Sequence, residues 1–403
     1  MSFQTGLSGL NASSRNLDVI GNNIANANTT GMKSSRAEFG DLVASSLGVG
    51  GGGGVGIGVG IGAIAQQFSQ GNINTTNNEL DVAINGSGFF QLAQPDGSIA
   101  YTRDGSFKLD KDGFLRTNTG ANVMGFPTDN LGNATSVTPQ KMQLPTSAPI
   151  AAKATSTITA EFNLDARAPV AATQVPPTPR TTYGTSLTLF DSQGAPVPLS
   201  VFFERVASTT TDNWDVYDVA SGGSPLFQLQ FDANGTLTAP AAPPTLTVAT
   251  PSAVTPVIST TLDIAKVTQF GAAFAVSNLT QDGFAPGELT GLSIGESGVI
   301  TTRFSNGQTQ AAGQILLADF RNVQGLKPLG NNAWAATFDS GLPVQGKAGD
   351  GKFGALRAGA LEESNVDLTS ELVNMITAQR AYQANAQTIK TQDQILSTLV
   401  NLR

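Results

Sequence analysis

Two apolar series with a seven-residue spacing, one at each end of the chain, most constrain how it can fold. The N-terminal series is Phe3, Leu10, Leu17 and Ile24, with Leu7 and Ile20 on adjoining positions. The C-terminal series is Leu368, Met375, Tyr382, Ile389 and Leu396, flanked by Leu372. Because apolar residues at this spacing lie along one face of an α-helix, we expect an amphipathic helix at each end.

The C-terminal helix has clear limits in the sequence. Asp367 is a good N-cap, Glu371 lies in the first turn, and residues 368–403 contain neither Gly nor Pro. We therefore expect about 35 helical residues, or ~50 Å at 1.5 Å per residue. The polar faces carry Asn, Ser, Gln and Thr rather than ion pairs, so both helices need a partner. An intramolecular coiled coil is one interpretation; the uncharged faces favour packing between copies as the other. In the free monomer no neighbouring copy packs on these helices, so we expect both ends of the chain to be disordered there.

Between the ends the pattern changes to that of β-structure. Asp96-Gly97, Asp104-Gly105 and Asp112-Gly113 follow one another at eight-residue spacing and predict a β-meander. Strand-like runs return at 299–304 and 314–320, with Asn306-Gly307 as a turn. We expect these flanking segments to form one discontinuous β domain.

Pro-rich stretches and Thr- and Val-rich strands set off the middle of the chain as an insertion. The strand candidates there are 187–190, 199–203, 214–219 and 226–231. The fold class expected is mostly β with α-helical termini and nested, discontinuous domains. Its four parts are a helical coiled coil (1–30 and 364–403), a Gly-rich connector (31–70), a β domain (71–144 and 285–363) and an inserted outer β domain (145–284).

Composition excludes several classes of function. The chain has no Cys and no His, which removes disulfides, thiolate and Ser/His catalysis, and His- or Cys-ligated zinc. A net charge of −8 leaves no basic footprint for nucleic acid. The N-terminus lacks a Sec signal pattern, and no apolar run is long enough to insert in a membrane.

Four short motifs have ordinary explanations. The run 48–62 contains ten glycines and matches GxGxxG, but no βαβ pattern frames it, so we interpret it as a flexible or extended connector. Asp110, Asp112 and Gly113 form half of an EF-hand pattern, and Asp339-Ser340-Gly341 is a lone protease-like triplet; both predict turns. Glu362 and Glu363 are adjacent and diverge on any regular element. We predict no enzyme activity, no catalytic residue, no cofactor and no metal site.

The ends of the chain resemble bacterial flagellar rod and hook proteins. The motif residues are Asn22, Asn23, Ile24, Ala25, Asn26, Thr30, Gly31, Gly88, Phe89, Phe90, Gln379, Arg380 and Tyr382. The likeness covers about residues 1–145 and 285–403, and Met32 stands where the family usually has Phe. The large insertion favours the hook branch over the shorter distal rod proteins. The alternatives are another flagellar axial component and a secreted β-rich binding module.

The resemblance implies a structural subunit that assembles with copies of itself into a curved, flexible tube. This tube is the flagellar hook, a universal joint that transmits torque from rod to filament. Further implied partners are the distal rod protein, the hook cap protein, the hook-filament junction protein and the flagellar type III export apparatus, with an extracellular location at the hook. The two apolar series above are the expected polymerisation residues.

Overall fold

The computed structural model describes residues 2–43, 56–145, 149–209, 211–251 and 255–401. The chain divides into two compact units. Unit 1 comprises Met1–Ser147, Gly291–Thr302 and Gln310–Arg403; unit 2 comprises Ala148–Thr290 and Arg303–Thr309. Strands make up most of the regular structure and a long helix stands at each end, which confirms the expected fold class.

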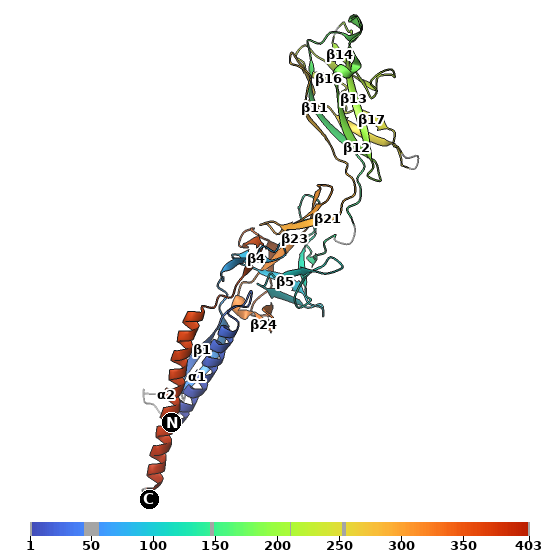
Figure 1. Cartoon of the computed structure of the whole chain (residues 1–403). Coiled ribbons are helices and arrows are strands. Elements are labelled where there is room, and N and C mark those ends of the chain that lie inside the picture. The colour runs from blue at the N-terminus through green and yellow to red at the C-terminus, as the bar shows by residue number, and fades with distance from the viewer. Residues whose placement is uncertain (1, 44–55, 146–148, 210, 252–254, 402–403) are drawn as a thin grey trace. The chain divides into compact units, whose positions relative to one another are not determined.

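Helices α1 (Ser2–Ala25) and α2 (Leu368–Asn401) lie side by side in unit 1 (Figure 1). They run antiparallel, since Gly6 faces Ile389 near one end and Asn23 contacts Glu371 near the other. The predicted N-cap is confirmed: the Asp367 carboxylate accepts hydrogen bonds from the amides of residues 369 and 370, at 2.9 and 3.3 Å.

Strands β1 (Ser35–Val43) and β2 (Gly56–Gln66) form an antiparallel hairpin that packs on α1. The expectation of a connector over 31–70 is therefore corrected for these strands. Alternating Gly with Val and Ile in β2 lets the strand approach its neighbours closely, which a flexible linker does not need. Residues 48–55 of the glycine run lie outside the described residues.

The β part of unit 1 joins segments that are far apart in the sequence. Strand β3 (Ile73–Thr75) pairs with β28 (Ala360–Glu362), and β4 (Val82–Asn85) pairs with β27 (Ala355–Ala358). The large sheet has 12 strands, with the main order β21-β22-β23-β9-β5-β6-β25-β24. Its strands are β5 (Phe89–Ala93), β6 (Ile99–Thr102), β7 (Phe107–Leu109), β8 (Leu115–Thr117), β9 (Asn122–Phe126), β10 (Gln140–Lys141), β21 (Leu289–Ile294), β22 (Val299–Phe304), β23 (Thr309–Asp319), β24 (Lys327–Gly330), β25 (Ala333–Ala335) and β26 (Val344–Lys347), with the short helix η3 (Val323–Gly325) before β24.

The expected meander is correct at two of its three turns. Gly97 and Gly113 have φ of 86° and 81° and close the hairpins β5–β6 and β7–β8. The turn at Asp104-Gly105 does not join paired strands. The Asp104 carboxylate accepts hydrogen bonds from the amide and hydroxyl of Ser106, at 3.0 and 2.8 Å, and this local turn directs β7 away from β6.

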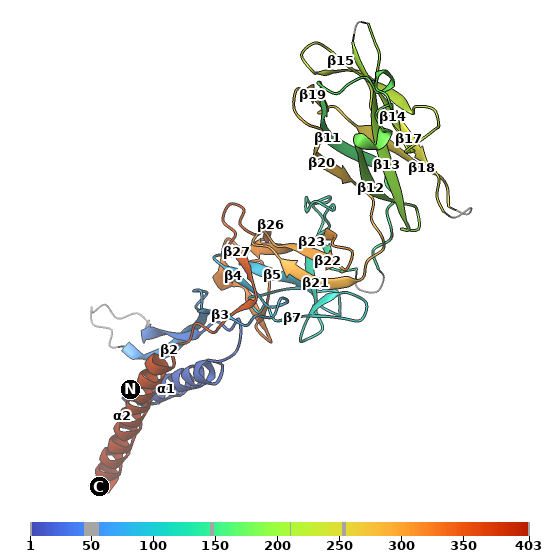
Figure 2. The ribbon, with the colours of Figure 1, turned by 45° about the horizontal axis from the view of Figure 1, so that its top comes forward.

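Unit 2 contains two five-stranded sheets (Figure 2). One has the order β12-β13-β14-β15-β16, and the other has β17-β18-β11-β19 with β20 also paired to β11. A shared core, centred on the fully buried Trp214, draws side chains from both sheets and makes them one sandwich. The elements are β11 (Thr157–Asp165), η1 (Ala171–Thr173), η2 (Arg180–Thr182), β12 (Gly184–Phe190), β13 (Pro196–Val206), β14 (Asp212–Tyr217), β15 (Phe227–Phe231), β16 (Leu237–Ala239), β17 (Thr245–Val248), β18 (Ile258–Asp263), β19 (Thr268–Phe270) and β20 (Ala275–Gln281).

Candidate assembly interface

The seam between α1 and α2 is built from small side chains. A Cβ added at Gly6 would lie 3.1 Å from Ile389 Cγ1, and one added at Gly9 would lie 2.9 Å from Asn385 Oδ1. Asn385 also donates to Ser13 Oγ at 3.4 Å. Because glycine leaves room for the facing side chain, the two helix backbones approach closely at these positions.

Several large apolar side chains of the two helices remain partly in water. Phe3, Leu7, Leu368, Leu372 and Tyr382 are exposed, with relative accessibilities of 46, 45, 42, 48 and 36%. Six of the predicted residues are half-buried or buried: Leu10, Leu17, Ile20, Ile24, Met375 and Ile389. The side chain of Leu396 lies outside the described set. Large apolar side chains left exposed on helices are typical of a surface that another chain covers.

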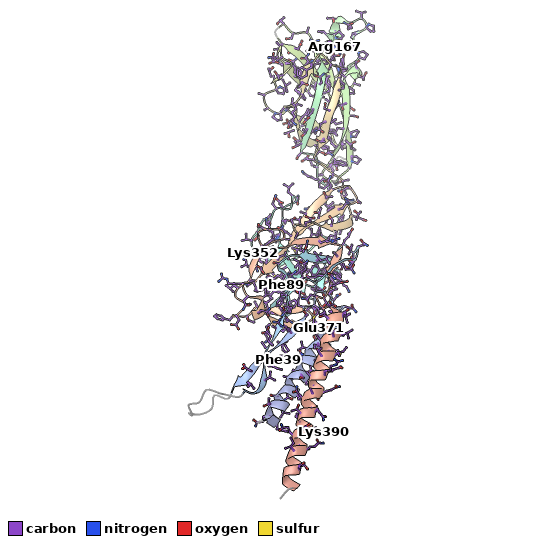
Figure 3. The ribbon with its side chains drawn as sticks, turned by 90° about the vertical axis from the view of Figure 1, so that its left-hand side faces the viewer. Phe39, Phe89, Arg167, Lys352, Glu371 and Lys390 are labelled. Carbon is purple, nitrogen blue, oxygen red and sulfur yellow. The ribbon has the colours of Figure 1, made fainter. Side chains whose placement is uncertain are left out.

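The hairpin β1–β2 packs beside the two helices and contacts α1. Gly58 has φ +140° and lies so close to Ser8 that a Cβ there would collide with the Ser8 hydroxyl. The amide of Val59 donates to that hydroxyl at 3.3 Å. Figure 3 shows Phe39 on the hairpin, and Glu371 and Lys390 on α2. Sequence analysis missed the hairpin, although the strict Gly/Val/Ile alternation of residues 56–62 was a signal for a strand.

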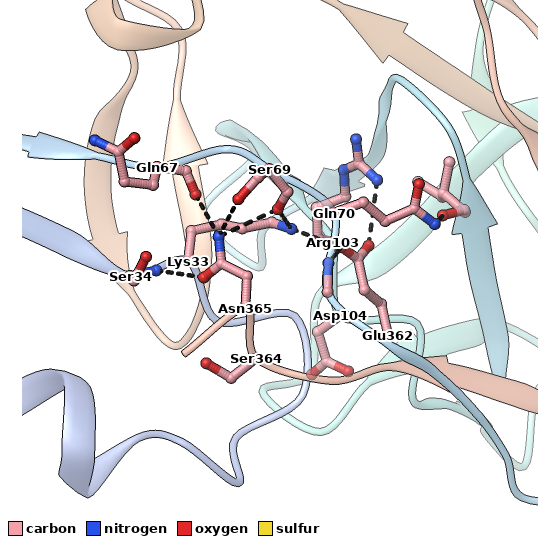
Figure 4. Close-up of polar contacts among 12 residues, drawn as sticks. Lys33, Ser34, Gln67, Ser69, Gln70, Arg103, Asp104, Glu362, Ser364 and Asn365 are labelled. Atoms are coloured by element: carbon pink, nitrogen blue, oxygen red, sulfur yellow. Dashed lines mark hydrogen bonds and ion pairs between the residues drawn. The ribbon is translucent and has the colours of Figure 1, made fainter. Parts of the chain in front are cut away.

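A buried ionic network joins the hairpin, the β domain and the start of α2 (Figure 4). Lys33 Nζ lies 2.6 Å from Glu362 Oε1 and donates to the Ser69 carbonyl at 2.8 Å, while Arg103 reaches Glu362 Oε2 at 3.2 Å. The Lys33 and Glu362 side chains are 0% exposed. Burial lowers the pKa of Lys33, and Glu362 partly opposes that shift. The same desolvation lowers the pKa of Arg103.

Asn365 extends this network. Its side chain accepts from the Ser34 amide at 2.7 Å and donates to the carbonyls of Gln67 and Ser69, at 2.8 and 3.2 Å. The segments that enter and leave the hairpin are thus hydrogen-bonded to the segment that precedes α2. No spacing in the sequence indicated these contacts, because Lys33 and Glu362 are 329 residues apart.

The N-terminal motif residues lie where α1 gives way to the hairpin. Asn23 is 1% exposed and bonds both backbone groups of Ser35, donating at 2.8 Å and accepting at 2.9 Å. It also donates to Glu371 at 3.3 Å. Asn26 Nδ2 donates to the carbonyl of Asn22, an exposed residue, at 3.0 Å. Ile24 is half-buried and Ala25 is exposed.

The motif continues into the β domain. Thr30 Oγ1 donates to Asp104 at 3.1 Å, and the buried Gly31, with φ +67°, donates its amide to the Glu362 carbonyl at 2.8 Å. A Cβ at Gly31 would collide with the backbone of residues 103 and 104, so glycine is required there.

The second motif block, Gly88 to Phe90, lies at the start of β5. Phe90 is 0% exposed and packs edge-on to Phe107. Phe89 packs edge-on to Trp334, with the Arg103 guanidinium 5.3 Å from its ring centroid. Gly88 has φ +121°. In the C-terminal block, by contrast, Gln379 and Arg380 are exposed on α2 beside Tyr382. Phe89 and Phe90 therefore pack in the interior of the β domain, whereas the C-terminal motif residues lie on the surface of α2.

The acidic motifs occupy structural positions. Asp110 and Asp112 belong to the β7–β8 turn, and Asp339 to the turn closed by Gly341. Glu362 is committed to the ionic network, whereas Glu363 accepts from Asn74 at 3.2 Å. Within the described ranges, no three His, Cys, Asp or Glu residues are placed to hold a metal ion. Among the described helices, none is long and apolar enough to span a membrane.

An antiparallel helical pair with exposed large apolar side chains, hydrogen-bonded to the β part of unit 1, is typical of a structural protein. Four family profiles match the chain: "Flagella basal body rod protein" (3–33), "Flagellar hook protein FlgE/F/G D1 domain" (83–161), "Flagellar basal body protein FlaE D2 domain" (163–284) and "Flagellar basal body rod FlgEFG protein C-terminal" (357–402). They place the chain among flagellar axial proteins.

Relatives that match over their full length identify the chain more closely within the flagellar axial proteins. The chain is 42% identical to the flagellar hook protein FlgE of Escherichia coli (strain K12), with 100% of both chains covered. It is 41% identical to that of Salmonella typhimurium, again over 100% of each. A crystal structure of Helicobacter pylori flagellar hook protein FlgE2 has a similar fold, with TM-score 0.56 and 16% identity over 72% of this chain and 100% of that one. The chain belongs to the flagellar hook protein FlgE family and is a structural subunit of the hook.

Proposed function

We propose that the terminal helices and the apolar rows on them are the elements through which copies of this chain assemble into the hook tube. The observation that carries the proposal is the exposure of large apolar side chains on an antiparallel helical pair. Leu7 and Leu372, for example, are 45 and 48% exposed. Covering such side chains is worth roughly 1.5–3 kcal/mol each when burial is complete.

The four-part division of the chain gives each part a role in this proposal. The helices (1–30 and 364–403) form the inner wall, the flanking β domain (71–144 and 285–363) the body of the tube, and the inserted domain (145–284) the outside. The inserted domain has few charged side chains, so few ion pairs can form between the outer domains of neighbouring copies. The outer domains therefore slide past one another while the helices stay fixed. This combination makes a tube that bends while it transmits torque.

The remaining partners follow from the same role. A hook subunit at the two ends of the tube meets the distal rod protein and the hook-filament junction protein, and it adds beneath a hook cap protein. We propose export by the flagellar type III apparatus and an extracellular location, and no catalytic activity.

Electron microscopy of the purified chain under salting-out conditions tests this function. A variant that lacks residues 1–30 and 364–403 is the comparison, and circular dichroism checks that its β domains remain folded. We expect tubes from the full chain alone. Tubes from the truncated chain would overturn the role of the helices, and monodisperse particles from both would favour a β-rich binding module instead.

A further inference from the structure

A groove runs between α1, the hairpin and α2. Its volume is about 560 Å³, and small residues form most of its lining: Gly9 and Ala12 from α1, Gly58 from β2, and Ala378 and Ala381 from α2, with Phe39 from β1 as the large exception. Among the described residues that line it, none is charged. A groove of this size and polarity accommodates a few apolar side chains.

The same chain carries side chains that fit such a groove. Leu372, Val373 and Ile376 form an uncharged strip on α2 and are 48, 56 and 50% exposed. At about 100° per residue, Ile376 lies roughly 160° around the helix axis from Ala378, which lines the groove. The strip therefore points away from the groove of its own chain.

A projecting strip and a receiving groove on opposite sides of one helix define a head-to-tail contact. Such contacts between identical chains propagate into open helical assemblies, whereas a self-complementary patch stops at a dimer. The area that three side chains bury is well below the ~800 Å² per partner that a stable complex usually buries. The contact thus forms where many copies hold one another at high effective concentration, as in a polymer.

We propose that Leu372, Val373 and Ile376 of one copy enter the groove of the next copy. The hairpin β1–β2 is then part of the assembly interface, because Phe39 and Gly58 form one wall of the groove. This inference rests on the proposed self-assembly and adds the direction of the contact and the role of the hairpin.

Disulfide cross-linking tests the contact cleanly, since the chain has no cysteine. We would make Ile376→Cys with Ala381→Cys, assemble tubes, confirm them by microscopy, and oxidise with diamide. We expect a ladder of dimers, trimers and higher multimers on a non-reducing gel, and monomers from each single variant. A second pair, Ile376→Cys with Ser13→Cys, probes the opposite wall and should give the same ladder. The control pair, Ile376→Cys with Lys390→Cys, should stay monomeric because Lys390 lies outside the groove.

The lowest protein concentration that yields tubes tests the role of the hairpin. Phe39→Ala should raise this concentration about tenfold, because it removes the aromatic side chain from the groove wall. Leu42→Ala is the matched control: Leu42 is 47% exposed on the same strand but does not line the groove, so it should change this concentration less than twofold.

The outcomes separate the two proposals. Intact tubes that give no ladder with either groove pair, or a single dimer band, would overturn this head-to-tail contact and leave the proposed function standing. Equal effects of Phe39→Ala and Leu42→Ala would overturn the role of the groove wall. Absence of tubes from the unmodified chain would overturn the proposed function and this inference with it.

Discussion

Replacing Glu362 by Gln should destabilise unit 1 more than a change of one atom suggests. The carboxylate of Glu362 is fully buried and pairs with Lys33 through one oxygen and with Arg103 through the other. Gln keeps the shape of the side chain but removes its charge. Both cations then remain in the interior without the anion that compensates them.

The magnitude follows from the cost of an uncompensated buried charge. Breaking a buried ion pair by removing one partner destabilises a protein by about 3–5 kcal/mol. Lys33 limits the loss by releasing its proton, since its pKa is already lowered by burial, whereas an Arg remains charged. At about 2–4 °C per kcal/mol for a unit of this size, the midpoint of thermal unfolding should fall by roughly 6–20 °C.

Differential scanning calorimetry of the full chain measures this change, with the transition of unit 2 as an internal reference. Glu363→Gln is the matched control, because this neighbouring carboxylate makes an exposed hydrogen bond to Asn74. It should change the free energy of unfolding by less than about 0.5 kcal/mol. A loss below about 1 kcal/mol in Glu362→Gln would refute the view that the network stabilises the junction.

The variant should also gain stability as the pH rises. The pKa of Lys33 is lowered in the folded state, so between that pKa and 10.5 the unfolded state binds more protons. Stability therefore increases with pH in this window. Removing Glu362 removes the group that raises this pKa, so the window widens and the increase becomes larger than in the parent chain.

Three further predictions concern other parts of the chain. Gly9→Val should clash with Asn385 across the helical seam and abolish tubes, while the unfolding of the β domains stays unchanged in calorimetry. Trp214→Ala should lower the stability of unit 2 by about 3–5 kcal/mol by emptying a fully buried site, with no change in the unit 1 transition. Burial opposes ionisation of Asp282, but hydrogen bonds led by that from Lys153 outweigh it and hold its pKa well below the usual range. Because a lowered carboxyl pKa stabilises above the unfolded value of ~3.9, Asp282→Asn should be less stable than the parent at pH 7, and urea titrations should show the gap closing as the pH falls below about 4.

Local sequence patterns were enough to predict the terminal helices and several strand connections. Seven-residue apolar spacing and a good N-cap at Asp367 identified the terminal helices, and turn dipeptides such as Asn306-Gly307 marked strand connections. These signals are readable because helix periodicity, capping and positive φ depend on residues that are close in sequence. The resemblance of the two ends to flagellar rod and hook proteins indicated the family for the same reason: its motif blocks are short and contiguous.

Only the tertiary structure decided which surfaces meet. The Lys33 and Glu362 charges, 329 residues apart, form a buried pair because the segments that flank the hairpin pack against the segment before α2. The glycine-rich strand is ordered because α1 and β1 pack against it, which no local preference of glycine dictates. Asp104-Gly105 has the residues of a hairpin turn, yet its carboxylate bonds Ser106 and Thr30 instead. Long-range packing sets each of these outcomes, and it also decides which apolar residues of the helices are buried, such as Ile20, and which stay exposed, such as Leu7 and Leu372.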